Sequence, residues 1–195
     1  MYKNLLLIAS LFLATACSGS SATATADDSS APFKVNEITS FNEPWAMTFL
    51  PDGRLLVAVQ PGQLFVVTQD GGKSRAVRGV PNVDYRGQGG LGDVILHPDY
   101  ENNKTIYLSY AEGGVGGKTR GAAIARGTLE FDERGNAAFT DAKVIWRQVP
   151  KVTGAGHYGH RMAFDSDGYL FITSGDRQKF DPAQDMTGNV GKVVR

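Results

Sequence analysis

The stretch Trp45-Ala-Met-Thr-Phe-Leu-Pro-Asp-Gly-Arg-Leu-Leu-Val-Ala-Val59 decides the fold of this chain. It contains two short apolar runs, and the dipeptide Asp-Gly lies between them. Such a turn between two apolar runs is a strong signal for a β-hairpin, because glycine readily adopts the positive φ that tight hairpin turns need. We therefore expect strands over residues 45–50 and 54–59, and a third strand over residues 63–68.

The same hairpin signature recurs twice further along the chain. Residues 91–96 lead through His-Pro-Asp and a longer loop to residues 105–110, and residues 161–164 lead through Asp-Ser-Asp-Gly to residues 169–173. The aspartates at positions 52, 99 and 167 mark the same point of each copy, at separations of 47 and 68 residues. The first separation is close to the period of a β-propeller blade, and the second fits a blade with an insertion.

Further strands are expected over residues 122–131 and 143–147, which would supply about four strands per copy. The sequence thus predicts an all-β fold in which residues 33–195 form about the first three blades of a β-propeller. A β-sandwich is the alternative, but one hairpin that recurs at blade-like spacing favours the propeller. Since propellers have four to eight blades, we expect the chain to be the front portion of a longer protein, with residues 190–195 inside a strand.

Composition excludes some partners. The chain has 20 basic and 20 acidic residues, scattered rather than clustered, so no nucleic-acid partner is expected. The 24 glycines suit a fold with many tight turns.

The first residues predict export. Residues 1–16 have the basic, apolar and small-residue regions of a signal peptide, and Cys17, the only cysteine, follows directly. Leu13-Ala-Thr-Ala-Cys17 resembles a bacterial lipobox, although Ala14 stands where leucine is usual. Residues 17–32 hold no large apolar side chain and predict a flexible tether. We expect a periplasmic or cell-envelope lipoprotein of a bacterium, with a lipid anchor as its only membrane contact; ordinary cleavage that leaves a free Cys17 is the alternative.

A candidate catalytic pair surrounds the third hairpin. His157 lies in Gly154-Ala-Gly-His-Tyr-Gly-His-Arg161, directly before the hairpin, and Asp176 directly follows it. An imidazole on a glycine-rich loop with a nearby carboxylate suits a general base and its orienting partner. The alternative is a loop histidine that makes an ordinary hydrogen bond.

Four segments in order, within a match that runs from about residue 38 to the last residue, resemble the glucose/sorbosone dehydrogenase family of soluble, pyrroloquinoline quinone (PQQ)-dependent aldose sugar dehydrogenases. They begin at Phe41-Asn-Glu-Pro-Trp-Ala, Gly87-Gln-Gly-Gly-Leu-Gly-Asp, Gly156-His-Tyr-Gly-His-Arg and Asp181-Pro-Ala-Gln-Asp. The resemblance implies a six-bladed propeller with PQQ over its central channel, and oxidation of an aldose to a lactone.

The resemblance also implies roles for three residues. It aligns Gln88 with a glutamine near the quinone and the sugar, His157 with the catalytic histidine, and Asp176 with the acid that supports this histidine. It implies Ca²⁺ beside PQQ, with ligands in later blades. The choice of sugar would depend on loops of all blades, and the electron acceptor stays unknown.

Some residues fit the family less directly. His160 stands where the family has glycine or another small residue, so it either crowds the loop or points outward, and it competes with His157 for the role of base. Arg161 is expected to be structural. Asp181 and Asp185 are potential metal ligands, although solvated loop carboxylates fit them better.

Two other functions compete with sugar oxidation. One is a non-catalytic propeller lipoprotein that binds carbohydrate or protein. The other is a calcium-dependent propeller hydrolase such as a lactonase, which would need a converging set of Asp, Glu and Asn ligands that these blades do not display.

Overall fold

The computed structural model describes residues 32–195. The chain divides into two units, Met1–Asn36 and Glu37–Arg195, and the second contains the strands. The predicted signal peptide and Cys17 lie outside the described residues, as does nearly all of the predicted tether. Among the described residues, no helix has both the length and the apolar character needed to cross a membrane.

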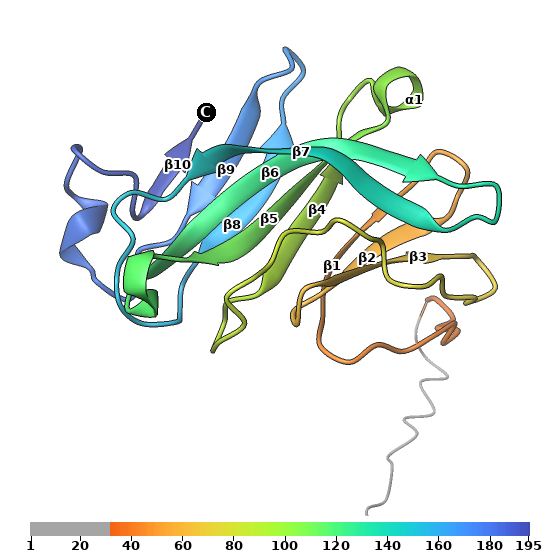
Figure 1. Ribbon diagram of the computed structural model, residues 1–195, viewed down its shortest axis with the longest axis horizontal. Coiled ribbons are helices and arrows are strands. Elements are labelled where there is room, and N and C mark those ends of the chain that lie inside the picture. Colours follow the sequence, from red (N-terminus) through yellow and green to blue (C-terminus); the bar gives the residue numbers. More distant parts are fainter. Residues whose placement is uncertain (1–31) are drawn as a thin grey trace, which may run out of the picture. The chain divides into compact units, whose positions relative to one another are not determined.

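Three antiparallel sheets make up the second unit (Figure 1). The first contains, in order, β1 (Pro44–Phe49), β2 (Leu55–Val59) and β3 (Gln63–Val67). The second contains β4 (Leu91–Leu96), β5 (Thr105–Gly113), β6 (Arg120–Phe131) and β7 (Ala137–Arg147). The third has the order β10-β9-β8, with β8 (Gly159–Phe164), β9 (Leu170–Ser174) and β10 (Lys192–Val194). The short helix α1 (Tyr100–Asn103) and the 3₁₀ turns η1 (Val115–Gly117) and η2 (Asp181–Ala183) lie in connections.

The all-β prediction is confirmed, and each of the three predicted hairpins is present as an antiparallel pair: β1 with β2, β4 with β5, and β8 with β9. The expectation of about four strands per copy is wrong for the first and third sheets, which have three strands each in the described part of the chain. The segments predicted over 122–131 and 143–147 both belong to the second sheet, as β6 and β7. The wider second separation is therefore taken up by the long strands of that sheet. The number of blades in a closed ring stays a prediction.

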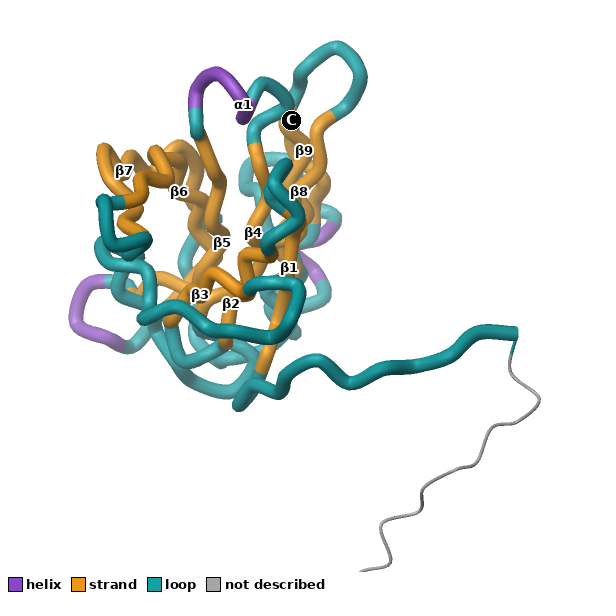
Figure 2. The backbone as a smooth tube through the Cα atoms, turned by 90° about the vertical axis from the view of Figure 1, so that its right-hand side faces the viewer, coloured by secondary structure: helices purple, strands orange, loops and turns teal. Residues whose placement is uncertain are grey.

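The sheets pack face to face in chain order, with the second in the middle, and β4 contacts both β1 and β8 (Figure 2). Between the first and second sheets, the core buries large aliphatic side chains such as Leu56, Leu64, Leu91 and Ile106. Between the second and third it buries Tyr107, Ile124, Met162 and Ile172. Because both faces of the middle sheet are covered, β5 is buried along most of its length. Removal of this apolar surface from water is the main force that holds the sheets together.

A buried carboxylate also joins the second sheet to the third. Asp93 lies at a bulge in β4, and its Oδ2 accepts a hydrogen bond of 2.8 Å from the backbone N–H of Met162 on β8. Its Oδ1 accepts one of 3.0 Å from Arg161 Nη1. Burial raises the pKa of Asp93, while the bonds from Met162 and Arg161 oppose that rise. Arg161 thus has the structural role expected from the sequence.

Candidate active site

The loop that carries His157 is bonded to the loop that carries Gln88. The backbone N–H of His157 donates to Gln88 Oε1 at 2.7 Å, and the backbone N–H of Gln88 donates to Ala155 O at 2.8 Å. These two bonds join segments that lie 69 residues apart. Because the carboxamide oxygen of Gln88 is held, its Nε2 has a defined direction, and it makes no hydrogen bond within residues 32–195.

The structure brings His157 and Asp176 together. His157 Nδ1 lies 3.0 Å from Asp176 Oδ1, and 53% of the imidazole side chain is exposed. The N–H of Gln178 also donates to Asp176 Oδ1, and this bond and the one to His157 lower the pKa of the carboxyl. An ionised carboxylate is acceptor-only, so Nδ1 carries the proton and Nε2 is left as the basic nitrogen. The pair can therefore take a proton from a ligand at Nε2.

The backbone conformation at the ends of β8 and β9 explains how His157 and Asp176 come together. His157 has a positive φ of 47° and is the second residue before β8, while Asp176 is the second residue after β9. Since β8 and β9 are antiparallel neighbours, the start of one lies beside the end of the other. Gly175 N–H donates to Tyr158 O at 2.8 Å, which closes this end of the hairpin.

Arg177, which the sequence did not single out, lies beneath the His157 loop. It is buried, and its side chain donates to three backbone carbonyls: Gly156 O at 2.8 Å, Gly154 O at 2.7 Å and Arg120 O at 2.7 Å. Its guanidinium carbon lies 3.7 Å from the centre of the Tyr158 ring. No sequence motif marks such a residue, because its main acceptors are backbone atoms.

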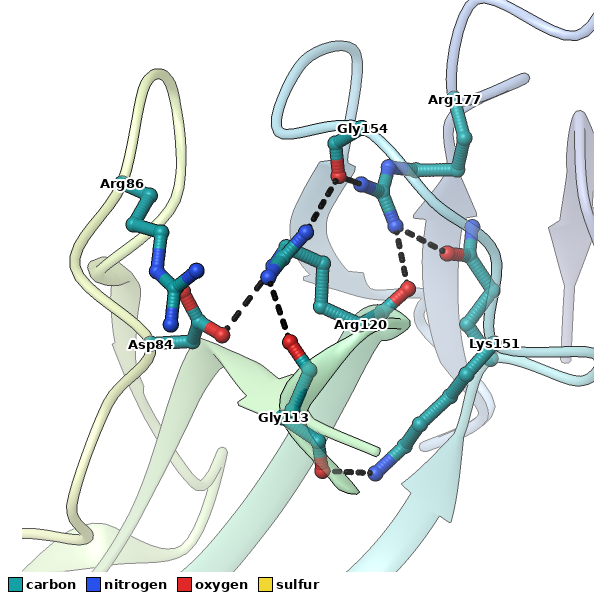
Figure 3. Close-up of polar contacts among 9 residues, drawn as sticks. Asp84, Arg86, Gly113, Arg120, Lys151, Gly154 and Arg177 are labelled. Carbon is teal, nitrogen blue, oxygen red and sulfur yellow. Dashed lines mark hydrogen bonds and ion pairs between the residues drawn. The ribbon is translucent and has the colours of Figure 1, made fainter. Parts of the chain in front are cut away.

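A second arginine links this cluster to the segment before Gln88 (Figure 3). Arg120 Nε lies 3.1 Å from Asp84 Oδ2, where Arg120 is buried and Asp84 is mostly buried. Arg120 Nη1 also donates to Gly154 O, the carbonyl that Arg177 holds from the other side. Both loops of the candidate site therefore rest on one buried network of charged side chains.

His160 is buried, which corrects the idea that it points outward. It lies beside the rings of Trp45 and Tyr158, with centroids 6.5 Å and 5.9 Å away, and neither ring nitrogen has a hydrogen-bond partner in the described structure. Burial, aided by the charges of Arg177 and Arg161, lowers the pKa of His160 to about 4. A base must reach its substrate, so the accessible His157 is the better candidate.

The two aspartates considered as potential metal ligands lie in η2 and just after it. Asp185 Oδ1 accepts from the N–H and Oγ1 of Thr187 at 2.8 Å and 2.7 Å, and these bonds lower its pKa. Asp181 begins η2, and its backbone carbonyl accepts from the N–H of Gln184. Across residues 32–195, no group of three or more His, Cys, Asp or Glu side chains is arranged to hold a metal. A surface hollow of about 820 Å³, lined by Tyr100 and Phe131 among others, includes neither His157 nor Asp176.

Comparison with known proteins finds relatives that match most of this chain. A family model described as Glucose / Sorbosone dehydrogenase matches residues 41–195. The chain is 41% identical over 155 residues to aldose sugar dehydrogenase YliI of Escherichia coli (strain K12), a match that covers 79% of this chain and 41% of that protein. The chain therefore spans about two fifths of the length of this curated relative.

Two solved structures have the same fold over most of this chain. The apo-form of the soluble aldose sugar dehydrogenase from Escherichia coli is 39% identical, with a TM-score of 0.73, over 78% of this chain and 43% of that one. The PQQ-bound form of aldose sugar dehydrogenase from Streptomyces coelicolor is 28% identical, with a TM-score of 0.69, over 80% of this chain and 45% of that one.

Proposed function

The chain belongs to the glucose/sorbosone dehydrogenase family, and we propose on this basis that it takes part in the PQQ-dependent oxidation of an aldose to a lactone. One observation carries the proposal: the exposed imidazole of His157 is paired with Asp176 at 3.0 Å. The bond from His157 N–H to Gln88 and the PQQ-bound structural relative lend it support.

In the proposed reaction, His157 Nε2 accepts the proton of the anomeric hydroxyl as the hydride leaves the anomeric carbon. The sugar loses two electrons and two hydrogens and becomes a lactone. Asp176, bonded to Nδ1, holds the imidazole in the required tautomer and stabilises the imidazolium that forms. PQQ, when bound, supplies the two-electron acceptor for the hydride.

The residues present fit one edge of a quinone. A quinone offers carbonyl oxygens as acceptors, and Gln88 Nε2 is a donor whose carboxamide is already oriented by the bond from His157 N–H. We propose that Gln88 holds an oxygen of PQQ or of the sugar. The Ca²⁺ expected with PQQ would take oxygen ligands from elements other than those described here.

Dye reduction by the purified protein tests the proposal. Aldoses are supplied with PQQ and Ca²⁺ together and, in separate assays, with either PQQ or Ca²⁺ omitted. We expect dye reduction that requires both the sugar and PQQ. Sugar binding by calorimetry without any turnover would instead favour the alternative of a non-catalytic carbohydrate-binding propeller.

We also propose that the protein is exported and anchored through Cys17, because the motif Leu13-Ala-Thr-Ala-Cys17 follows an apolar leader. Labelled palmitate should enter the protein in a bacterial host. Cys17→Ser should abolish the label and release the protein from the membrane fraction. A wild-type protein that stays unlabelled and soluble would refute the anchor.

A further inference from the structure

We propose that Arg177 is a positioning residue for His157: its buried guanidinium fixes the loop before the histidine and thereby keeps the imidazole on Asp176. The inference deepens the proposed function and rests on it for its catalytic meaning. The hydrogen bonds from Arg177 to this loop, called the clamp below, are a property of the structure and can be tested without measuring turnover.

The guanidinium holds the loop at two points. Its Nε and Nη2 donate to Gly156 O at 2.8 Å and to Gly154 O at 2.7 Å, so two carbonyls of the three residues before His157 are restrained. Gly154 has a φ of +88°, a conformation that only glycine adopts readily, and glycine adds backbone freedom that another group must restrain. The backbone N–H of Arg177 donates to His157 O at 3.2 Å, which adds a third point.

The other side of the guanidinium is anchored to the second sheet. Its Nη1 donates to the backbone carbonyl of Arg120 at 2.7 Å, at the start of β6, and to Gln148 Oε1 at 3.3 Å, just past β7. Gln148 in turn donates to Ser174 Oγ and to Gly175 O, the two residues before Asp176. Arg177 and Gln148 thus link the second sheet to the segments that carry His157 and Asp176.

The groups that accept hydrogen bonds from Arg177 indicate a role other than that of a partner in an ion pair. Buried arginines are normally paired with a carboxylate, because burial of an unpaired charge is costly. Within the described residues no ion pair includes Arg177, and its partners are neutral oxygens and the ring of Tyr158. A planar fork of donors can bridge three separate segments, whereas the ammonium group of lysine cannot reproduce that fork.

Arg177 also follows Asp176 directly in the chain. Arg177 and Gln178 both have positive φ, at 56° and 58°, so this turn directs the carboxylate toward His157 and the guanidinium under the loop. A shift of Arg177 would therefore disturb His157 and Asp176 together. We expect loss of the clamp to lengthen the bond between His157 Nδ1 and the carboxylate, and so to weaken the preference for the Nδ1–H tautomer.

Nitrogen NMR of the histidine ring measures that preference in the purified protein. His157→Gln identifies the signals. In the wild type we expect His157 to be mainly the Nδ1–H tautomer at a pH at which the imidazole is neutral. In Arg177→Lys, which keeps the charge but not the fork, we expect the ratio of the two tautomers to shift several-fold toward equality. Arg161→Lys is the matched control, since Arg161 bonds Asp93 instead, and it should leave the ratio unchanged.

Near-ultraviolet circular dichroism shows whether Arg177→Lys is folded. A folded variant with the wild-type tautomer ratio overturns the proposal. If the variant does not fold, Gln148→Met decides, since it keeps the arginine and removes both an acceptor of Arg177 and the bonds to Ser174 and Gly175. It should shift the ratio in the same direction by less, and an unchanged ratio overturns the proposal. A wild type without dye reduction would refute the proposed function and leave this tautomer measurement intact.

Discussion

The imidazole of His160 on β8 lies against the backbone of Gly92 on β4. A Cβ placed at position 92 would lie 2.1 Å from His160 Cε1 and 2.5 Å from its Nδ1. Separations this short cannot exist between non-bonded atoms, so the observed position of the His160 ring requires a glycine at position 92. A histidine at position 160 is therefore accommodated by the absence of a side chain on the neighbouring sheet.

Gly92→Ala should consequently destabilise the protein by about 1–3 kcal/mol, as overpacking of a buried seam typically does. Chemical denaturation measures the change. Gly113→Ala is the control, because the nearest atom to its added Cβ lies at 3.6 Å and its φ is not positive. In the double variant with His160→Gly, the part of the penalty caused by the histidine should disappear, whereas the close contact with Ser109 Oγ, at 2.8 Å, remains. Strictly additive effects of the two substitutions would contradict the contact.

The stability of the protein should fall in acid because of His160. Its pKa is lowered from 6.5 to about 4, so the unfolded chain binds the proton first as the pH falls. The native state should lose up to roughly 3 kcal/mol relative to the unfolded state between pH 6.5 and pH 4. Denaturation of wild type and His160→Leu at a series of pH values gives the difference. A pH-independent difference would show that His160 is not held neutral.

His157→Ala should lower the rate of sugar oxidation by about 10²–10⁴, the usual effect of losing a general base. Binding of PQQ, measured by fluorescence titration, should change much less. His97→Gln is the control histidine, because His97 bonds Asp99 N–H and Asn103 away from the candidate site. Full activity of His157→Ala would assign the base elsewhere.

Asp176→Asn should also reduce turnover, because the amide no longer stabilises an imidazolium and can favour the wrong tautomer. The pKa of Asp176 is below its ordinary 3.8. Its carboxylate therefore stabilises the native state above that pH, and this contribution is lost as the pH falls through the lower, native value. Melting temperatures of wild type and variant should differ at pH 5 and above and converge below pH 3.8. Convergence already near pH 6 would be inconsistent with a lowered pKa.

Asp93→Ala should be more destabilising than Arg161→Ala. The first change leaves the buried N–H of Met162 without its acceptor, which costs about 1–3 kcal/mol. The second removes a guanidinium that is 63% exposed, and Asp93 keeps the bonds from Met162 and Val94. Urea denaturation of both variants ranks them, and the reverse order would show that the ion pair dominates.

The sequence predicted those features that depend on short stretches. The turn around Asp52 and the alternating or continuous apolar runs beside it determine a hairpin locally, and the same holds for the copies at Asp99 and Asp167. The pairing of His157 with Asp176 could be predicted because the two residues flank one hairpin, whose open end brings them together.

Features that depend on contacts between sheets could not be predicted in this way. Asp93 reaches residues 68 and 69 positions away, and Arg177 binds backbone carbonyls, which carry no signature in the sequence. The inward direction of His160 depends on the space at Gly92. The number of strands in the first sheet was overestimated, because residues 68–90 contribute only single bridges at Lys73 and Arg78.

The bond from the Met162 N–H to Asp93 has a consequence for how this protein can change through mutation. The carboxylate recognises the main chain of β8, which every residue except proline supplies in the same form. Position 162 is thus free to accept other apolar side chains without loss of this link, whereas position 93 must keep an acceptor of the same reach. Substitutions at position 93 of β4 should therefore be tolerated less well than substitutions at position 162 of β8. Proline at position 162 should be the exception, because it lacks the N–H that Asp93 accepts.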